Sequence, residues 1–381
     1  MKPQGKVIFI FCFFLVLLVS LIFKTAEHKV SFTPDMTLRQ FALVNDIQPG
    51  KLKAELGLPS VRGKTTLREL GIDRQKAGAI ASHIRGDVFG KKMAGLHVLF
   101  AAAVCLAVFL LWRKKMNAAV KYVMLSAAVI GFGFILGKTY NPMVALVKTF
   151  KGLAGIEANF AAWMIVLVLF CILAILGTKA VCGWVCPYGA LQELLFKLPF
   201  FAAWKKKHKV PFGLTNGIRL GLFALFIAGL IWNMFSLKQQ GRTIYHVINP
   251  FNLFEFNFDG PAITLYIVAT LVLSLFFYRP HCYCVCPFGL VSWLLGKLSV
   301  FKIRINRQAC TDCGACVKAC PSQAMKGLYE YAVFPADCFS CGECLRACAF
   351  DALSYTGQTM QPQSSGNCDK ACIRPDSQDT L

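Results

Sequence analysis

Hydrophobic residues along this chain gather in long, nearly uninterrupted runs. About 20 mainly apolar residues are needed for a helix to cross the hydrocarbon layer of a bilayer. Six stretches approach that length, so the pattern predicts an α-helical membrane bundle of about six transmembrane helices. The predicted spans run approximately from Val7 to Phe23, Met93 to Trp112, Ala118 to Gly137, Ala161 to Gly177, Ile218 to Phe235 and Ala262 to Tyr278.

The composition agrees with a membrane protein. Of the 381 residues, 56% are hydrophobic and only 16% are charged, too few charges to cover a soluble protein of this size. The net charge of +22 would suit a nucleic-acid-binding protein, but many basic residues lie beside the apolar runs. We therefore expect the lipid bilayer as a partner and no nucleic acid.

Basic clusters in the short loops predict the orientation. Arg113 to Lys115 follow the second span, and four lysines between Lys205 and Lys209 separate the fourth and fifth spans. Loops rich in Lys and Arg stay in the cytoplasm, so both ends of the chain are expected there. The first span is either an uncleaved anchor or a signal peptide, and the absence of an A-x-A site after it favours the anchor.

These features divide the chain into five predicted parts. A pair of similar phrases, TLRQFA and TLRELG, indicates a small helical domain outside the membrane, which is either a docking domain for a periplasmic partner or a spacer. The tail is polar and is expected to be disordered. The parts are an N-terminal membrane anchor (1–24), the extracytoplasmic helical domain (25–92), a five-helix membrane domain (93–301), a cytoplasmic domain (302–355) and the tail (356–381).

The cytoplasmic domain carries the most specific motif. Two runs, CTDCGACVKACP and CFSCGECLRACA, have the C-x2-C-x2-C-x3-C spacing of two-cluster ferredoxins. The fourth cysteine of each run ligates the other cluster, so an α+β dicluster ferredoxin-like domain with two 4Fe-4S clusters is predicted. The expected ligands are Cys310, Cys313, Cys316 and Cys348 for cluster 1, and Cys338, Cys341, Cys344 and Cys320 for cluster 2.

A second cysteine motif occurs twice, 100 positions apart. VCGWVCPYGALQELLFKL and HCYCVCPFGLVSWLLGKL each contain C-x3-C-P after a predicted span and before a short amphipathic stretch. These stretches predict helices lying at the membrane surface. Three interpretations stay open: thiols that pack a turn, a thiol–disulfide pair, or an additional redox or metal site shared by both copies. The four cysteines are Cys182, Cys186, Cys282 and Cys286.

With both motifs present, residues 93–355 resemble the polytopic iron–sulfur proteins of the NapH and NosR type. The resemblance implies a protein of the bacterial inner membrane that transfers electrons between the quinone pool, or a cytoplasmic donor, and a periplasmic or membrane redox partner. A quinol dehydrogenase-type subunit is one form of this function, and quinone or quinol is then a ligand. No flavin-attachment sequence of the NosR type occurs, and the first span and residues 25–92 are additions to the four-span NapH type.

Two other functions fit the same motifs. An assembly or redox-regulatory protein for a periplasmic metalloenzyme would use its clusters as sensors. A metal-ion reductase would use the four thiols of the C-x3-C-P motifs. Rapid reduction and reoxidation by a quinone analogue distinguishes the electron-transfer protein from the sensor.

Overall fold

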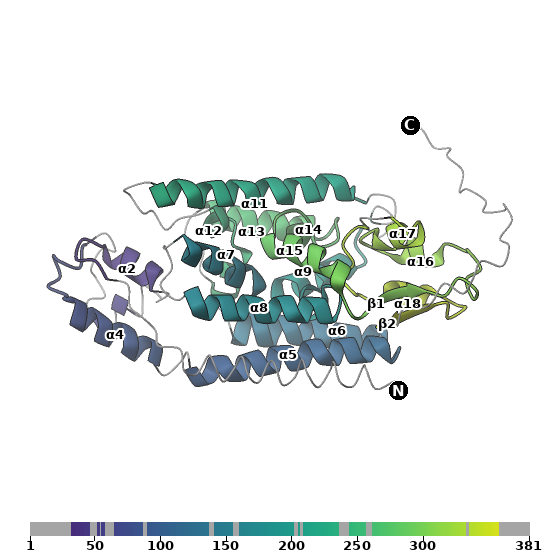
Figure 1. The fold of residues 1–381 in the computed structure, drawn as a ribbon, viewed down its shortest axis with the longest axis horizontal. Coiled ribbons are helices and arrows are strands. Elements are labelled where there is room, and N and C mark those ends of the chain that lie inside the picture. The colour runs from purple at the N-terminus through teal and green to yellow at the C-terminus, as the bar shows by residue number, and fades with distance from the viewer. Residues whose placement is uncertain are drawn as a thin grey trace.

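The computed structural model describes residues 32–45, 52–53, 55–57, 65–86, 90–136, 141–154, 160–201, 205, 209–235, 244–256, 261–332 and 335–357. The predicted first span and nearly all of the predicted tail, with Cys368 and Cys372, lie outside these residues. Figure 1 shows a helical bundle with a small helical unit at one end and the two-stranded sheet with its helices at the other. The two terminal units are therefore separated by the length of the bundle.

The bundle contains three helices long and apolar enough to cross a membrane, judged by length and composition within the described residues. These are the segments Gly95–Trp112, Ala118–Ile135 and Phe212–Trp232. Two further apolar helices, at the positions of the predicted fourth and sixth spans, are shorter, with 17 and 13 residues. The helices of the bundle are α5 (Gly90–Trp112), α6 (Ala118–Ala127) with its π-helical continuation η1 (Ala128–Ile135), α7 (Pro142–Leu153), α8 (Phe160–Leu176), α11 (Phe212–Phe235), α12 (Ile244–Val247), η3 (Pro250–Glu255) and α13 (Pro261–Leu273).

The N-terminal helical unit is built on the duplicated phrase. Thr37 and Gln40 bond each other's backbone N–H groups, and Thr66 and Glu69 do the same. Each pair is a capping box, and the two threonines meet in an antiparallel bridge. The unit has a small apolar core of its own, which includes the predicted Leu38, Phe41, Ala42 and Leu52. Its helices in the described residues are α2 (Leu38–Val44) and α4 (Arg74–Gly86).

The two C-x3-C-P motifs form two copies of one backbone unit. In both, a short helical turn containing the first cysteine leads to a helix that begins at the proline, where a missing N–H costs nothing. In the second helix of each copy, the polar residues Gln192, Glu193 and Ser292 are buried. Leucines on the other side, Leu194 and Leu195 in the first copy and Leu294 and Leu295 in the second, are partly exposed. The first copy comprises η2 (Val181–Val185) and α9 (Pro187–Lys197), and the second comprises α14 (Pro280–Cys284), α15 (Pro287–Leu295) and η4 (Gly296–Leu298).

The C-terminal module is closed by a two-stranded antiparallel sheet. Lys302 pairs with Thr356 and Ile305 with Leu353. The elements are β1 (Lys302–Ile305), α16 (Ala315–Ala319), α17 (Ala324–Tyr329), α18 (Glu343–Ala347) and β2 (Leu353–Thr356).

This module is joined to the bundle by backbone hydrogen bonds. The N–H groups of Val300 and Phe301 donate to the carbonyls of Ile175 and Leu176, at 2.8 and 2.9 Å. These carbonyls end α8 and have no partner within that helix. The segment leading into β1 therefore caps α8 and fixes the module against it.

Candidate metal centres and their interface

The two cysteine-rich loops of the C-terminal module have matching backbone conformations. Asp312 and Gly314 have φ of 54° and 68°, and Ser340 and Gly342, 28 positions later, have φ of 49° and 75°. Left-handed residues at these points turn each loop sharply between successive cysteines. The two loops therefore have the same curved form.

The first predicted ligand set lies around one pocket. Cys310, Cys313 and Cys316 from the first loop and Cys348 from the second all line it, together with apolar residues that include Ile305 and Leu353. Cys313 is exposed to solvent. This pocket brings together the four thiols predicted for cluster 1, and their chemistry fits an iron–sulfur cluster.

The second predicted ligand set lies on the inner side of the module. Burial, together with the neighbouring Cys341 and Cys320, raises the pKa of Cys338 to about 12. The pKa of Cys344 is also raised, mainly by burial, and Cys338, Cys341 and Cys320 contribute. The four sulfurs predicted for cluster 2 are therefore near enough to influence one another. Buried thiols of this kind become thiolates when a metal binds. Cluster 2 would thus be the more deeply buried of the two.

The two C-x3-C-P copies share several unusual backbone features. Lys179 and Arg279, 100 positions apart, both have a left-handed backbone, with φ of 55° and 51°. Gly189 and Gly289 also correspond, because a Cβ on either would lie 2.9 or 2.7 Å from the carbonyl oxygen of the first cysteine in its own motif. Both glycines are therefore required for the close approach of helix and turn.

The four motif thiols are buried and brought together by contacts that cross between the copies. The Cys182 sulfur lies 3.9 Å from the Ser292 hydroxyl, and the Cys282 sulfur lies 3.6 Å from the Gln192 amide oxygen. Gln192 and Ser292 occupy corresponding positions in the two copies. Cys186 and Cys286 complete the group, and burial raises the pKa of each to about 12, with other motif thiols adding to the effect.

The predicted ligands are not arranged for a single metal ion. In the part of the chain that the structure describes, no three His, Cys, Asp or Glu side chains could hold one ion together. This holds for the ferredoxin cysteines and for the motif thiols alike. An iron–sulfur cluster distributes its ligands over several iron atoms, so the result concerns mononuclear sites only.

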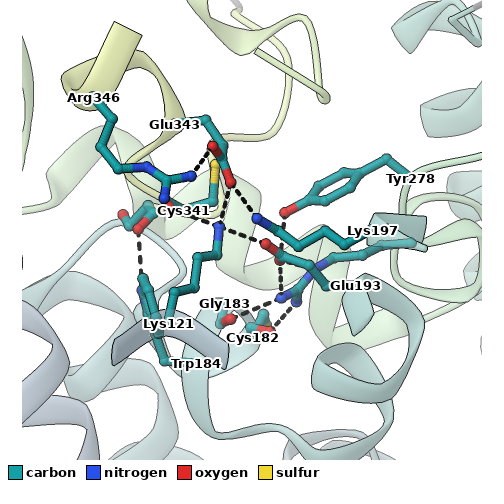
Figure 2. Close-up of polar contacts among 12 residues, drawn as sticks. Lys121, Cys182, Gly183, Trp184, Glu193, Lys197, Tyr278, Cys341, Glu343 and Arg346 are labelled. Carbon is teal, nitrogen blue, oxygen red and sulfur yellow. Dashed lines mark hydrogen bonds and ion pairs between the residues drawn. The ribbon is translucent and has the colours of Figure 1, made fainter. Parts of the chain in front are cut away.

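A buried carboxylate, Glu193, joins the first motif copy to its surroundings (Figure 2). It lies 2.6 Å from the Lys121 ammonium and 2.5 Å from the Arg279 guanidinium, and it accepts a hydrogen bond of 2.8 Å from Tyr278. Burial alone would raise the pKa of Glu193, but Lys121 and Arg279 outweigh it, so the pKa is lowered and the carboxylate stays charged. Arg279 also donates to the carbonyls of Cys182 and Gly183.

The same network reaches the loop of cluster 2. Lys121 donates to the carbonyl of Cys341 at 2.8 Å and pairs with Glu343 at 3.0 Å. Lys197, on α9, pairs with the same Glu343 at 2.6 Å. Burial raises the pKa of Glu343, but these two lysines lower it to about 2. Lysines of α6 and α9 thus contact the second cysteine loop and the helix that follows it.

A second buried carboxylate, Asp337, comes from the ferredoxin module itself. It pairs with Lys179 and, at 2.9 Å, with Arg219 of α11. Lys179 also donates to the carbonyl of Gly289 at 2.7 Å, and Arg219 contacts the carbonyl of Cys282 at 3.4 Å. Asp337 directly precedes Cys338, so this acid links the loop of cluster 2 to both motif copies.

The loop between Cys338 and Cys341 is inserted between the two motif copies. The Trp184 indole donates to the carbonyl of Ser340 at 3.0 Å. Phe339 is only 1% exposed, and its ring lies 5.7 Å from that of Tyr283. A Cβ on Gly183 would lie 2.2 Å from the Phe339 carbonyl oxygen, so the first copy needs a glycine here. The loop of cluster 2 therefore packs directly on both C-x3-C-P motifs.

A cavity of about 220 Å³ lies beside this junction. Its walls come from the end of α13 and the turn after it, from the segment before α11, and from Pro321 to Gln323 of the ferredoxin module. Lys209 lines it and donates to the carbonyl of Cys320 at 3.0 Å. Cys284, which the sequence left without a role, also lines this cavity.

Six buried charged residues of this interface were missed by the sequence analysis: Lys121, Lys179, Glu193, Arg219, Arg279 and Asp337. A signal existed for some of them. Lys121 falls inside a predicted span, where an ionisable residue indicates a functional or paired site. Lys179 and Arg279 stand at the same offset from the two motifs. Their partners could not be identified, because each pair joins residues far apart in the sequence.

Two family models match the chain, and both are described as a 4Fe-4S binding domain. One matches residues 159–208 and 260–306, which contain both C-x3-C-P motifs, and the other matches residues 302–325. No solved structure matches the chain.

Curated relatives also match part of the chain. The "Putative electron transport protein YccM" of Escherichia coli (strain K12) is 32% identical over 43% of this chain and 47% of its own length. The "Ferredoxin-type protein NapH" of Haemophilus influenzae is 25% identical over 56% of this chain and 75% of its own. The "Regulatory protein NosR" of Pseudomonas aeruginosa is 30% identical over 39% and 21%.

The chain thus spans about half the length of YccM and a smaller part of NosR. The segments that the family models match contain both C-x3-C-P motifs and the first ferredoxin run. The predicted resemblance to proteins of the NapH and NosR type is confirmed. The chain therefore has two matches to 4Fe-4S binding domains, contains three membrane-length helices within its described residues, and is similar to ferredoxin-type proteins of the NapH and NosR type.

Proposed function

We propose that this chain is an electron-transfer subunit of the bacterial inner membrane, which passes single electrons between its two ferredoxin clusters and the membrane. Cluster 1 would be held by Cys310, Cys313, Cys316 and Cys348, and cluster 2 by Cys338, Cys341, Cys344 and Cys320. The observation that carries the proposal is the insertion of the loop from Cys338 to Cys341 between the two C-x3-C-P motifs.

The two ligand sets differ in burial, and this difference suggests which cluster faces solvent and which faces the membrane domain. Cys313 of cluster 1 is exposed, so this cluster would exchange electrons with a soluble or peripheral partner. Cys320 and Cys344 of cluster 2 are buried, at 7% and 8% exposure, and this cluster's loop contacts the membrane domain. Electrons would then move through cluster 2 whichever way they flow overall.

The proposed orientation places the ferredoxin module in the cytoplasm. Arg113, Lys114 and Lys115 follow α5 at the end of the bundle that carries the module, and Lys114 pairs with Asp351. Such basic clusters remain on the cytoplasmic side. The helical unit of α2 and α4, at the other end of the bundle, would then lie in the periplasm, where a redox partner could contact it.

The cavity beside cluster 2 would bind the ring of a quinone. Its lining includes two aromatic residues at the end of the sixth predicted span, Phe276 and Phe277, and two lysines, Lys205 and Lys209. A largely apolar cavity with a few polar groups is typical of small-molecule sites. Since quinol delivers two electrons and a cluster accepts one, a second acceptor must take the other electron.

The test is anaerobic reduction of the oxidised, full-length protein in detergent. A menaquinol analogue is added, and cluster reduction is followed by EPR and by visible bleaching. Rapid reduction is expected, together with at least a tenfold loss of rate in Phe277→Trp, which fills the cavity. Phe134→Trp, at a partly exposed position on η1, is the matched control.

Two outcomes would contradict this proposal. Reduction by dithionite but not by quinol would exclude quinol oxidation and favour a cytoplasmic donor, an assembly factor or a sensor. Equal rates in Phe277→Trp and the wild type would exclude the cavity as the quinone site.

A further inference from the structure

The four thiols of the C-x3-C-P motifs form one buried group with a positively charged surrounding. Each is between 6% and 8% exposed. Sulfur contacts cross from each copy to the other, through Ser292 and Gln192. The left-handed Lys179 and Arg279 and the two close-packed glycines reproduce this arrangement in both copies. The matching backbone features and the crossed contacts indicate that the four thiols belong to one site and do not pack independently.

Three buried cations contact the backbone of the two motif copies. Arg279 donates to the carbonyls of Cys182 and Gly183, Arg219 contacts the carbonyl of Cys282, and Lys179 donates to the carbonyl of Gly289. All three are at most 1% exposed.

The carboxylates near the group do not cancel this charge. Across the interface, the cations that are fully buried in the described residues are Lys121, Lys179, Arg219 and Arg279, and the fully buried carboxylates are Glu193 and Asp337. Each cation pairs with one of the two carboxylates, but each carboxylate is shared by two cations, so these six side chains carry a net charge of +2. Glu343, at the edge, is already shared among Lys121, Lys197 and Arg346.

Uncompensated buried charge is costly. Burial is the largest effect on Lys179 and lowers its pKa, and Arg219 adds to this, although Asp337 opposes it. Four neutral thiols, or two disulfides, carry no charge and would leave the net positive charge of the surroundings unchanged. Four thiolates around a metal centre would supply the missing negative charge.

We propose that Cys182, Cys186, Cys282 and Cys286 together ligate a third iron–sulfur cluster, whose negative charge is balanced by Lys179, Arg219 and Arg279. Two cysteines come from each motif copy. An oxidised cluster of either the 2Fe-2S or the 4Fe-4S type, with four thiolates, carries two net negative charges. A cluster is favoured over a mononuclear metal because the motif thiols, like the ferredoxin cysteines, are not gathered for a single ion.

This proposal goes beyond the proposed function and does not depend on quinol. It places a one-electron carrier against the loop of cluster 2, since Arg279 contacts Cys182 and Glu193, and Glu193 contacts Lys121, which donates to Cys341. The third cluster would extend the path from the ferredoxin module into the membrane domain.

The test is the content of iron and acid-labile sulfide in the anaerobically purified full chain. Two 4Fe-4S clusters give about eight iron atoms per chain. The proposal predicts about ten for an added 2Fe-2S cluster or about twelve for an added 4Fe-4S cluster. Mössbauer spectra of the iron-57-labelled wild type would show which type is present. About eight iron atoms, with the four motif thiols free or in disulfides by mass spectrometry, would overturn the proposal.

Variants assign the extra iron to the motif. Cys186→Ser with Cys286→Ser should lower the iron content to about eight atoms while the reduced ferredoxin clusters keep their EPR signal. Cys171→Ser, a half-buried cysteine of α8 outside both motifs, should keep the full content. Full iron in the double variant would overturn the ligand assignment. If that variant does not fold, the wild-type iron, sulfide and Mössbauer values still decide the question.

Discussion

The two C-x3-C-P copies have the same backbone but obtain their counter-charges from different parts of the chain. Arg279 of the second copy is neutralised by Glu193 of the first, within the membrane domain. Lys179 of the first copy has no such partner, because the residue that corresponds to Glu193 in the second copy is Trp293. Its acid is Asp337, from the ferredoxin module.

This difference distinguishes a contact made when the membrane domain folds from one made when the ferredoxin module docks on it. The membrane domain can satisfy the cation of the second copy without help, whereas the cation of the first copy is satisfied only when the ferredoxin loop is in place. Trp293, in turn, donates to the carbonyl of Pro335 at 3.0 Å, just before Asp337. The second copy, which has Trp293 in place of an acid, therefore helps to position the segment that carries Asp337.

The largest effect is expected from Glu193→Gln. This change leaves Lys121 and Arg279 buried without a carboxylate, and breaking a buried ion pair costs about 3–5 kcal/mol. The free energy of unfolding, measured in detergent by denaturant titration, should fall by that amount. Glu343→Gln is the control, because Glu343 is partly exposed and its loss should cost about 1 kcal/mol. Equal losses would show that Glu193 is not the central acid.

A smaller effect on stability, with a specific effect on docking, is expected from Asp337→Asn. The module can move away and let water reach Lys179 and Arg219, so the loss should be about 2–3 kcal/mol, below that of a pair that must stay buried. Hydrogen exchange should rise in residues 337–341 and in η2 together. Asp351→Asn, an exposed partner of Lys114, is the control. Unchanged exchange in η2 would contradict the docking role.

Gly183→Ala should disturb the contact without removing a charge. Its Cβ would meet the Phe339 carbonyl at 2.2 Å, and overpacking of this kind costs about 1–3 kcal/mol. We expect full ferredoxin iron content and at least a tenfold slower reduction of the clusters by quinol. Gly217→Ala, where a Cβ meets nothing within 4 Å, should behave as the wild type. Normal reduction in Gly183→Ala would show that the close contact is not needed.

The smallest effect is expected from Ser292→Ala. Its hydroxyl lies 3.9 Å from the Cys182 sulfur, a weak contact whose loss should cost less than about 1 kcal/mol. Gln192→Leu, at the corresponding position of the other copy, removes the amide beside Cys282 and should cost more, because a fully buried polar side chain is replaced. Thermal unfolding of the two variants compares them, and the reverse order would show that the crossed contacts are not equivalent.

The sequence allowed prediction of features whose signal is local. The ferredoxin ligand sets follow from cysteine spacings of a few residues, and the structure places Cys310, Cys313, Cys316 and Cys348 around one pocket. The capping boxes at Thr37 and Thr66 also have a local signal, a four-residue pattern, but the sequence analysis did not use it. The ligand assignment itself stays a prediction until iron is measured.

The charged interface could not be predicted in the same way. Asp337 and Arg219 are separated by 118 positions, and no local pattern shows that they meet. Hydropathy placed the end of the sixth span at Tyr278, whereas α13 ends at Leu273. The chain leaves the helix early and brings Tyr278 and Arg279 to Glu193, and hydropathy contains no information on that contact.

The backbone bonds from Val300 and Phe301 to the end of α8 have a consequence for kinetics. A carrier domain on a free linker delivers electrons by diffusing between two docking positions, and its turnover slows as the solvent becomes more viscous. Here the linker is itself hydrogen-bonded structure, so the spacing between carriers is set when the chain folds. Internal electron transfer should therefore be independent of solvent viscosity, and only the encounter with an outside partner should respond to glycerol or sucrose.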